Sequence, residues 1–232
     1  MSLTPFQEVA YEVAKSLIDA GRGSLFETPD TDLPQGRSDL IAKDDRIPQI
    51  GFVGEAYEIR RILVLGINPG NGSSNTRSPE DSKMMPALHD FVSDSNRGAY
   101  AAAMQAQMIA FPNWLASKEI GPILKDEGVN LAEIAYANAN PYRVEGNSSN
   151  HVFPNKTRER IAAMNWVLPL ALALSPRLII AHGQKAADVI KHCKISTRLL
   201  TYNRNHNAKI RSAANADFVS QFKNALAAQS SN

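Results

Sequence analysis

Four short apolar runs, separated by segments with helical patterns, constrain the fold of this chain more than any other feature. Helical patterns occur at roughly 96–125, in two pieces separated by Phe111-Pro112, and at 157–175, 184–193 and 216–228. The apolar runs are RILVLG (61–66), EIAYANANP (133–141), RLIIAHG (177–183) and RLLTY (198–202). Strands that alternate with helices need crossover connections, which give a parallel sheet with helices on both faces. The sequence therefore predicts an α/β protein, a three-layer α/β/α sandwich around a central, mainly parallel four-stranded sheet.

The segments outside this alternation predict a single domain. Thr4 and Gln7 form a capping box at the start of a helix over 5–20, whose apolar residues fall on one face. Residues 21–49 show no sustained period and are predicted to form a long connection, and 71–96 is also read as a loop. We expect a kink near Pro169 in the helix over 157–175. No linker divides the chain, so 1–232 is predicted to be one domain, with helix 5–20 and loop 21–49 packed on a 50–232 core.

Composition excludes several classes of site. Cys193 is the only cysteine among 232 residues, so an internal disulfide and a four-thiolate metal or iron–sulfur site are impossible. The opening MSLTPFQEV lacks the pattern of a secretory signal, and the longest apolar stretch is too short to span a bilayer. We therefore expect a cytoplasmic protein with no membrane partner.

The four predicted strands end in turns that are rich in polar side chains. Ligands of open parallel sheets bind outside the carboxyl ends of the strands. These ends read GINPGNGSS, NANPYR, AHGQK and TYNRNHNAKIR. They carry Asn, His and Arg, but no serine, cysteine or carboxylate nucleophile in a recognisable frame, and neither of the two common phosphate-binding loops. The sequence predicts a site built from amide, imidazole and guanidinium groups at this edge.

These segments resemble the uracil-DNA glycosylase superfamily. GINPG (66–70) is similar to the first motif of mismatch-specific and single-strand-selective uracil-DNA glycosylases. EIAYANANPYR is similar to the strand that supplies the base-recognising Asn, SPRLIIAHGQKAADVI to the third strand and its helix, and TYNRNHNAKIR lies at the place of the His-bearing final motif. The resemblance covers roughly residues 62–226, at the level of motifs.

The resemblance implies a role for each matching residue. Asn68 would hold the attacking water, His206 would donate to the base oxygen where negative charge develops, and Asn138 would read the edge of the flipped base. No cofactor or metal is implied, and the expected partner is DNA bound by a monomer. The remaining substrate-binding positions are Gly66, Ile67, Pro69, Gly70, Asn140 and Arg143.

The charge distribution favours a nucleic-acid surface near the final motif. No acidic residue lies between Asp188 and Asp217. The basic residues of this stretch are Lys191, Lys194, Arg198, Arg204, Lys209 and Arg211. We expect the last three to contact the DNA backbone. The alternative is an ordinary solvated surface.

Two motifs differ from the family pattern. His206 is followed by Asn207-Ala208-Lys209-Ile210, where active members usually carry His-Pro-Ser. The stretch 71–86 lacks the aromatic residue that stacks on the base in the family pattern. The aromatic residues that follow it are better explained as core residues: Phe91, Tyr100, Phe111 and Trp114.

Each candidate residue also has a simpler structural explanation. Asn68 is a good turn residue before Pro-Gly, and Asn138 and Asn140 are suited to capping strand ends. His206 and Arg143 fit exposed positions, and His182 fits a structural role beside the Gly183 turn. The leading hypothesis is a glycosylase that removes uracil or a related damaged base from DNA. The alternatives are a non-catalytic nucleic-acid-binding member of the same fold and a hydrolase of a free nucleoside or nucleotide.

Overall fold

The computed structural model describes residues 2–20, 47–67, 69, 81–142, 155–204 and 208–230. The strands are β1 (Phe52–Val53), β2 (Ile62–Gly66), β3 (Ile134–Asn138), β4 (Leu178–His182) and β5 (Arg198–Tyr202). The α-helices are α1 (Pro5–Ala20), α3 (Tyr57–Arg60), α4 (Asp81–Asp94), α5 (Arg97–Ala110), α6 (Leu115–Asp126), α8 (Lys156–Ala162), α9 (Leu168–Leu174), α10 (Gln184–Cys193) and α11 (Ala208–Ser230). The shorter helical turns are η3 (Phe111–Asn113), η4 (Leu131–Glu133) and η5 (Ala163–Val167).

The strands form one sheet in the order β1-β3-β2-β4-β5. β3, β2, β4 and β5 are mutually parallel neighbours, whereas β1 pairs with β3 in the antiparallel direction. The prediction of a mainly parallel sheet is confirmed, and β1 adds a fifth strand to the predicted four. Two residues are too short a strand to give a sequence pattern. Gln107 of α5 instead fixes this edge by bonding both the N–H and the carbonyl of Gly51, at 3.0 and 2.8 Å.

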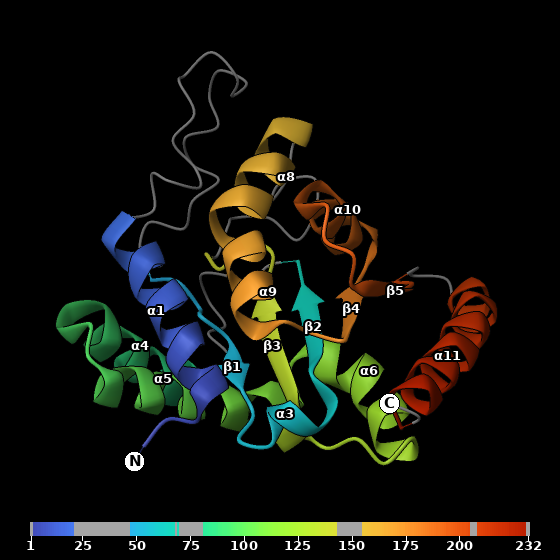
Figure 1. The fold of residues 1–232 in the computed structure, drawn as a ribbon, viewed down its shortest axis with the longest axis horizontal. Coiled ribbons are helices and arrows are strands. Elements are labelled where there is room, and N and C mark those ends of the chain that lie inside the picture. The colour runs from blue at the N-terminus through green and yellow to red at the C-terminus, as the bar shows by residue number, and fades with distance from the viewer. Residues whose placement is uncertain are drawn as a thin grey trace.

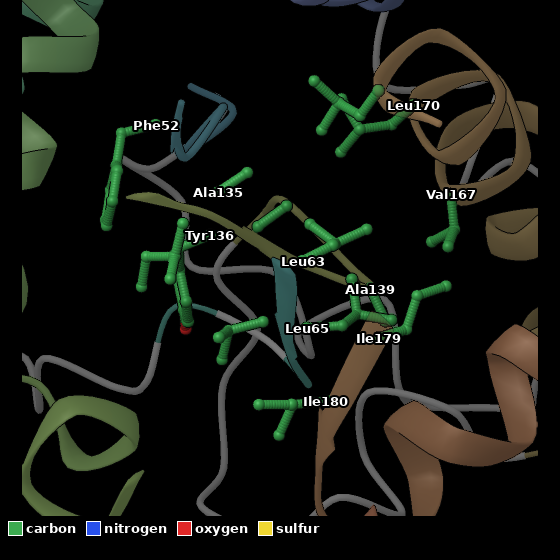
Figure 2. Close-up of a cluster of buried hydrophobic side chains, with 14 of the residues drawn as sticks. Phe52, Leu63, Leu65, Ala135, Tyr136, Ala139, Val167, Leu170, Ile179 and Ile180 are labelled. Carbon is green, nitrogen blue, oxygen red and sulfur yellow. The ribbon is translucent and has the colours of Figure 1, made fainter. Parts of the chain in front are cut away.

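Helices cover both faces of the sheet, which confirms the three-layer sandwich (Figure 1). One face carries α1, the α8–α9 helix and α10, and the other carries α4, α5 and α6, with α11 beside β5. Ile62 through Leu65 are fully buried because the central strand is covered on both sides. Figure 2 shows Leu63 and Ile179 on the side of Val167 and Leu170, with Tyr136 and Ile180 on the opposite side. Side chains alternate between the faces of a strand, so each strand contributes to both cores.

Helix α1 has the predicted bounds. Its capping box is present, with Thr4 N–H donating to Gln7 Oε1 at 2.9 Å and Gln7 N–H donating to Thr4 Oγ1 at 3.4 Å. α1 packs on α9, and Gln7 Nε2 also donates to the carbonyl of Val53 in β1. The helix is therefore attached to both the helical layer and the sheet edge. Residues 21–46 of the predicted loop over 21–49 lie outside the described residues.

The reading of 71–96 as a loop is wrong for its second half, because α4 spans Asp81–Asp94. Met84, Leu88 and Phe91 recur at helical spacing and are buried. Full burial of three such side chains contributes about 1.5–3 kcal/mol each, which outweighs the roughly 3 kcal/mol that Pro86 costs inside the helix.

The helix predicted over 157–175 is present with an unpredicted turn inside it, and the last helix begins earlier than predicted. The helix over 157–175 contains a five-residue π-helical turn, η5, just before Pro169. Proline lacks an N–H and crowds the preceding turn, and a wider turn relieves both problems. The last helix begins at Ala208 rather than near Ala216, so the predicted final loop ends earlier and Lys209 and Arg211 lie on the first turns of α11. Ala, Lys and Arg are good helix formers, which favours this extension.

Candidate functional site

The order of the parallel strands defines where a ligand site is expected. From β2 the chain continues to β3 on one side of the sheet, and from β4 it continues to β5 on the other side. β2 and β4 are neighbours, so the connections diverge between their carboxyl ends. Ligands of open α/β sheets bind outside the strands at such a switch point. We call the line along which β2, β3, β4 and β5 end the carboxyl edge.

Four residues at the carboxyl edge lie at one level and on one face of the sheet. Gly66 is paired in register with Asn138, and His182 with Tyr202. Leu65 is paired with Ala181, which places Gly66 and His182 side by side. Gly66 is required there because a Cβ would lie 2.4 Å from Asn138 Oδ1 and 2.5 Å from the Tyr136 hydroxyl. The missing side chain of Gly66 thus makes room for two polar groups between β3 and β4.

Asn138 is held from both faces of the sheet. Its Oδ1 accepts a hydrogen bond from the Tyr136 hydroxyl at 2.9 Å, and its backbone carbonyl accepts one from Trp166 Nε1 at 2.8 Å. Burial raises the pKa of Tyr136 far above its usual value, so the hydroxyl stays protonated and donates. The amide orientation is therefore fixed. Among the described residues, none accepts a hydrogen bond from Asn138 Nδ2.

His182 forms a buried pair with Glu119 of α6, whose Oε2 lies 2.6 Å from His182 Nε2. Burial lowers the pKa of His182 to about 4; the Glu119 hydrogen bond opposes this effect, and the positive charge of Arg204 adds to it. The imidazole is consequently neutral at pH 7. Because Nε2–H donates to the carboxylate, Nδ1 is left as an acceptor. Tyr202 packs against the imidazole, with ring centroids 5.8 Å apart.

Arg204 follows β5 and reaches back over the carboxyl edge. Its side chain covers Gly183, where an added Cβ would lie 3.1 Å from Arg204 Cδ and 3.5 Å from Ile67 Cδ1. Gly183 also has φ +104°, a conformation that favours glycine. Arg204 is thus directed toward the ends of β2 and β4 rather than outward from β5.

The structure describes only part of the predicted site. Gly66, Ile67, Asn138 and Arg204 come together at the carboxyl edge, and Pro69 is half-buried beyond β2. Lys209 and Arg211 are placed by their backbone alone. The positions outside the described residues are Asn68, Gly70, Arg143 and His206.

Asn140, two residues after Asn138 in the sequence, is also buried. Its N–H donates to the carbonyl of Ile67 at 2.9 Å, and its Oδ1 accepts from the N–H of Tyr142 at 2.9 Å. Its Nδ2 has no hydrogen-bond partner in the described part of the chain. The bonds that are present stabilise the turn after β3, as expected of an Asn at a strand end.

The basic stretch between Asp188 and Asp217 does not form one surface around the final motif, contrary to expectation. α10 runs from the carboxyl end of β4 to the amino end of β5, so Lys191 and Lys194 lie at its far end. Arg198 begins β5, whereas Arg204 follows its end. The antiparallel course of helix and strand separates residues that are close in sequence.

Among the aromatic residues considered for stacking, Phe91, Tyr100 and Phe111 belong to the buried core. Trp114 is half-buried and packs on Tyr136, with ring centroids 5.4 Å apart. Phe111 also packs on Tyr136, with ring centroids 4.7 Å apart, but it is buried, so Trp114 is the more accessible of the two.

Sequence reasoning missed four residues that support the site: Glu119, Tyr136, Trp166 and Asn215. Tyr136 could have been found, because it lies two residues before Asn138 on the same strand face. The other three had no local signal. Asn215 of α11 accepts from the Asn203 N–H at 2.8 Å and donates to its carbonyl at 3.0 Å, which fixes the backbone just before Arg204.

Within the described ranges, no group of three or more His, Cys, Asp or Glu side chains is arranged to hold a metal ion. No helix in those ranges is both long and apolar enough to cross a membrane. Comparison with models of known protein families gives no match, and comparison with curated protein sequences gives none that is significant.

Proposed function

We propose that this protein is a glycosylase that hydrolyses the N-glycosidic bond of uracil or a related damaged base in DNA. The observation that carries the proposal is the buried, oriented amide of Asn138 at the switch point of the sheet. Uracil presents an N–H donor beside a carbonyl acceptor. An amide with a fixed Nδ2 donor and a second Oδ1 lone pair is complementary to that edge. A base extruded from DNA would be recognised by these two hydrogen bonds to the Asn138 amide.

The chemistry of the site agrees with this reaction class. Bond cleavage leaves an electron-poor sugar carbon, so a held water suffices and no strong nucleophile is needed. In the proposal, Asn68 holds that water immediately beyond Ile67, and His206 donates to the base. Both residues lie outside the described part of the chain. Asn138, at the neighbouring strand end, would bind the base itself.

The proposal is tested with labelled oligonucleotides that contain uracil, in single strands and opposite guanine. We expect abasic sites to form with the wild-type protein. The Asn68→Ala and Asn138→Ala variants should be slower by about 10²–10³, the usual cost of losing a preorganised polar group at a reacting centre. Asn224→Ala, an exposed position on α11, is the matched control and should keep full activity.

Thermal unfolding of each variant separates loss of function from loss of fold. Asn138 is buried and bonded, so its variant must be shown to remain folded at the assay temperature. DNA binding without base release by the wild type would contradict the proposal and favour the non-catalytic binding protein. The altered sequence after His206 is the feature that favours this alternative. If the wild type neither releases a base nor binds DNA, a free nucleoside becomes the favoured substrate.

A further inference from the structure

Arg204 places a positive charge at the centre of the carboxyl edge. Its stem lies across Gly183 and beside Ile67, at the ends of β4 and β2. Burial dominates the pKa of both Tyr136 and His182, and the charge of Arg204 acts to lower each of them. These two side chains belong to β3 and β4, the strands on either side of β2. The guanidinium therefore acts on both sides of Gly66.

The Arg204 guanidinium has no counterion in the described part of the chain. No hydrogen bond or ion pair joins it to any residue there. Even the exposed Arg97 pairs with Glu8 at 2.8 Å and Glu12 at 3.3 Å. A half-buried charge is costly unless a partner compensates it. A cation that has no counterion among the described residues, beside a neutral imidazole and an amide, is suited to a ligand that carries or develops negative charge.

The backbone that leads into Arg204 is fixed by the fold. The two hydrogen bonds between Asn215 and the backbone of Asn203 attach the preceding residue to α11. Asn215 is itself buried, and Tyr202, one residue earlier, packs on Phe218 with centroids 5.6 Å apart. A side chain carried on a fixed backbone loses less freedom when the ligand binds, which favours its use in stabilising a transition state.

We infer that Arg204 is a catalytic residue whose guanidinium stabilises the negative charge on the departing base, rather than a contact to the DNA backbone. The inference rests on the proposed function. The bond between C1′ and the base nitrogen breaks with both electrons going to the nitrogen, and the charge spreads to the flanking carbonyl oxygens. Water then bonds to C1′ and releases one proton, while the base anion takes up one. Water is the only co-reactant, and Arg204 remains protonated throughout.

Leaving-group stabilisation and phosphate binding predict different kinetics for Arg204→Gln. Single-turnover rates at saturating protein are measured with uracil and with 5-fluorouracil, whose anion is more stable. We expect the uracil rate to fall about 10²–10³-fold. The 5-fluorouracil rate should fall at least several-fold less, and Arg204→Lys should recover part of the loss. The control is Arg198→Gln, an exposed position at the opposite end of β5, which should leave both rates unchanged.

Salt dependence of DNA binding completes the test. Loss of one phosphate contact weakens binding and reduces the slope of log K against log salt by about one unit. We expect Arg204→Gln to leave the slope and the unfolding temperature unchanged. A reduced slope with an unchanged saturated rate would overturn the inference and leave the glycosylase proposal standing. An equal rate loss for both bases would also overturn it. Absence of base release by the wild type would remove both proposals together.

Discussion

Gly66 is the position at which a single methyl group should most directly disturb the site. In Gly66→Ala the new Cβ would lie 2.4 Å from Asn138 Oδ1 and 2.5 Å from the Tyr136 hydroxyl. Both distances are far below van der Waals contact, so the hydrogen-bonded pair must move. Overpacking costs about 1–3 kcal/mol, and a broken buried hydrogen bond costs about 1–3 kcal/mol more. We expect a total loss of roughly 2–6 kcal/mol, or about 4–24 °C in melting temperature for a chain of this size.

Urea unfolding with a double-mutant cycle is the assay. Tyr136→Phe removes one of the two contacted atoms and frees Asn138 to rotate away. Gly66→Ala combined with Tyr136→Phe should therefore cost at least about 1 kcal/mol less than the sum of the single changes. Gly121→Ala is the control, because its Cβ would meet only Ser117 Oγ at 3.4 Å inside α6. It should stabilise the protein by up to about 1 kcal/mol.

Two results would refute this reasoning. Strict additivity of Gly66→Ala and Tyr136→Phe would mean that the hydroxyl is not the group displaced. A Gly66→Ala protein as stable as the wild type would mean that the end of β2 is not as close to the Asn138 side chain as the structure shows.

Three further predictions concern groups around the site. The unfolding free energy should fall by roughly 3 kcal/mol as pH drops from 6.5 toward about 4, because the unfolded chain protonates His182 before the folded one does. If His182→Gln shows the same loss of stability in acid, this prediction is wrong. Gly51→Ala should cost roughly 2–5 kcal/mol in urea unfolding, because φ is +76° and the new Cβ would lie 1.9 Å from the Tyr136 carbonyl oxygen; near-wild-type stability would show that the edge strand is not held this closely. Trp166→Phe should cost roughly 1–3 kcal/mol by leaving the Asn138 carbonyl unpaired, and an unchanged urea midpoint would show that the bond contributes nothing.

Local patterns predicted the regular parts of the fold accurately. The bounds of α1 and β5 agree with the sequence reading to the residue. Apolar runs and a capping box depend only on neighbours in the chain, so they can be read directly. β1 and α4 were missed for different reasons. β1 depends on Gln107, a residue from a distant helix, and the buried stripe of α4 was hidden by Pro86 and by the polar residues before it.

The candidate site was also predicted from local patterns only in part. Parallel strands bring their ends to one edge, so the sequence alone placed Gly66, Asn138 and Arg204 near one another. It could not show that Glu119 reaches His182 from 63 residues away, or that Arg204 turns inward. Nor could it show that the basic residues before and after β5 separate to opposite ends of the strand.

The sequence by itself determined the α/β alternation and the polar residues at the ends of the strands, because these follow from spacing along the chain. Only the tertiary structure decided which of those residues share a face, which pair, and which have no partner in the described ranges. Such relations depend on how α6 and α11 pack against the sheet. That packing keeps His182 buried against Glu119 and fixes the backbone that leads into Arg204.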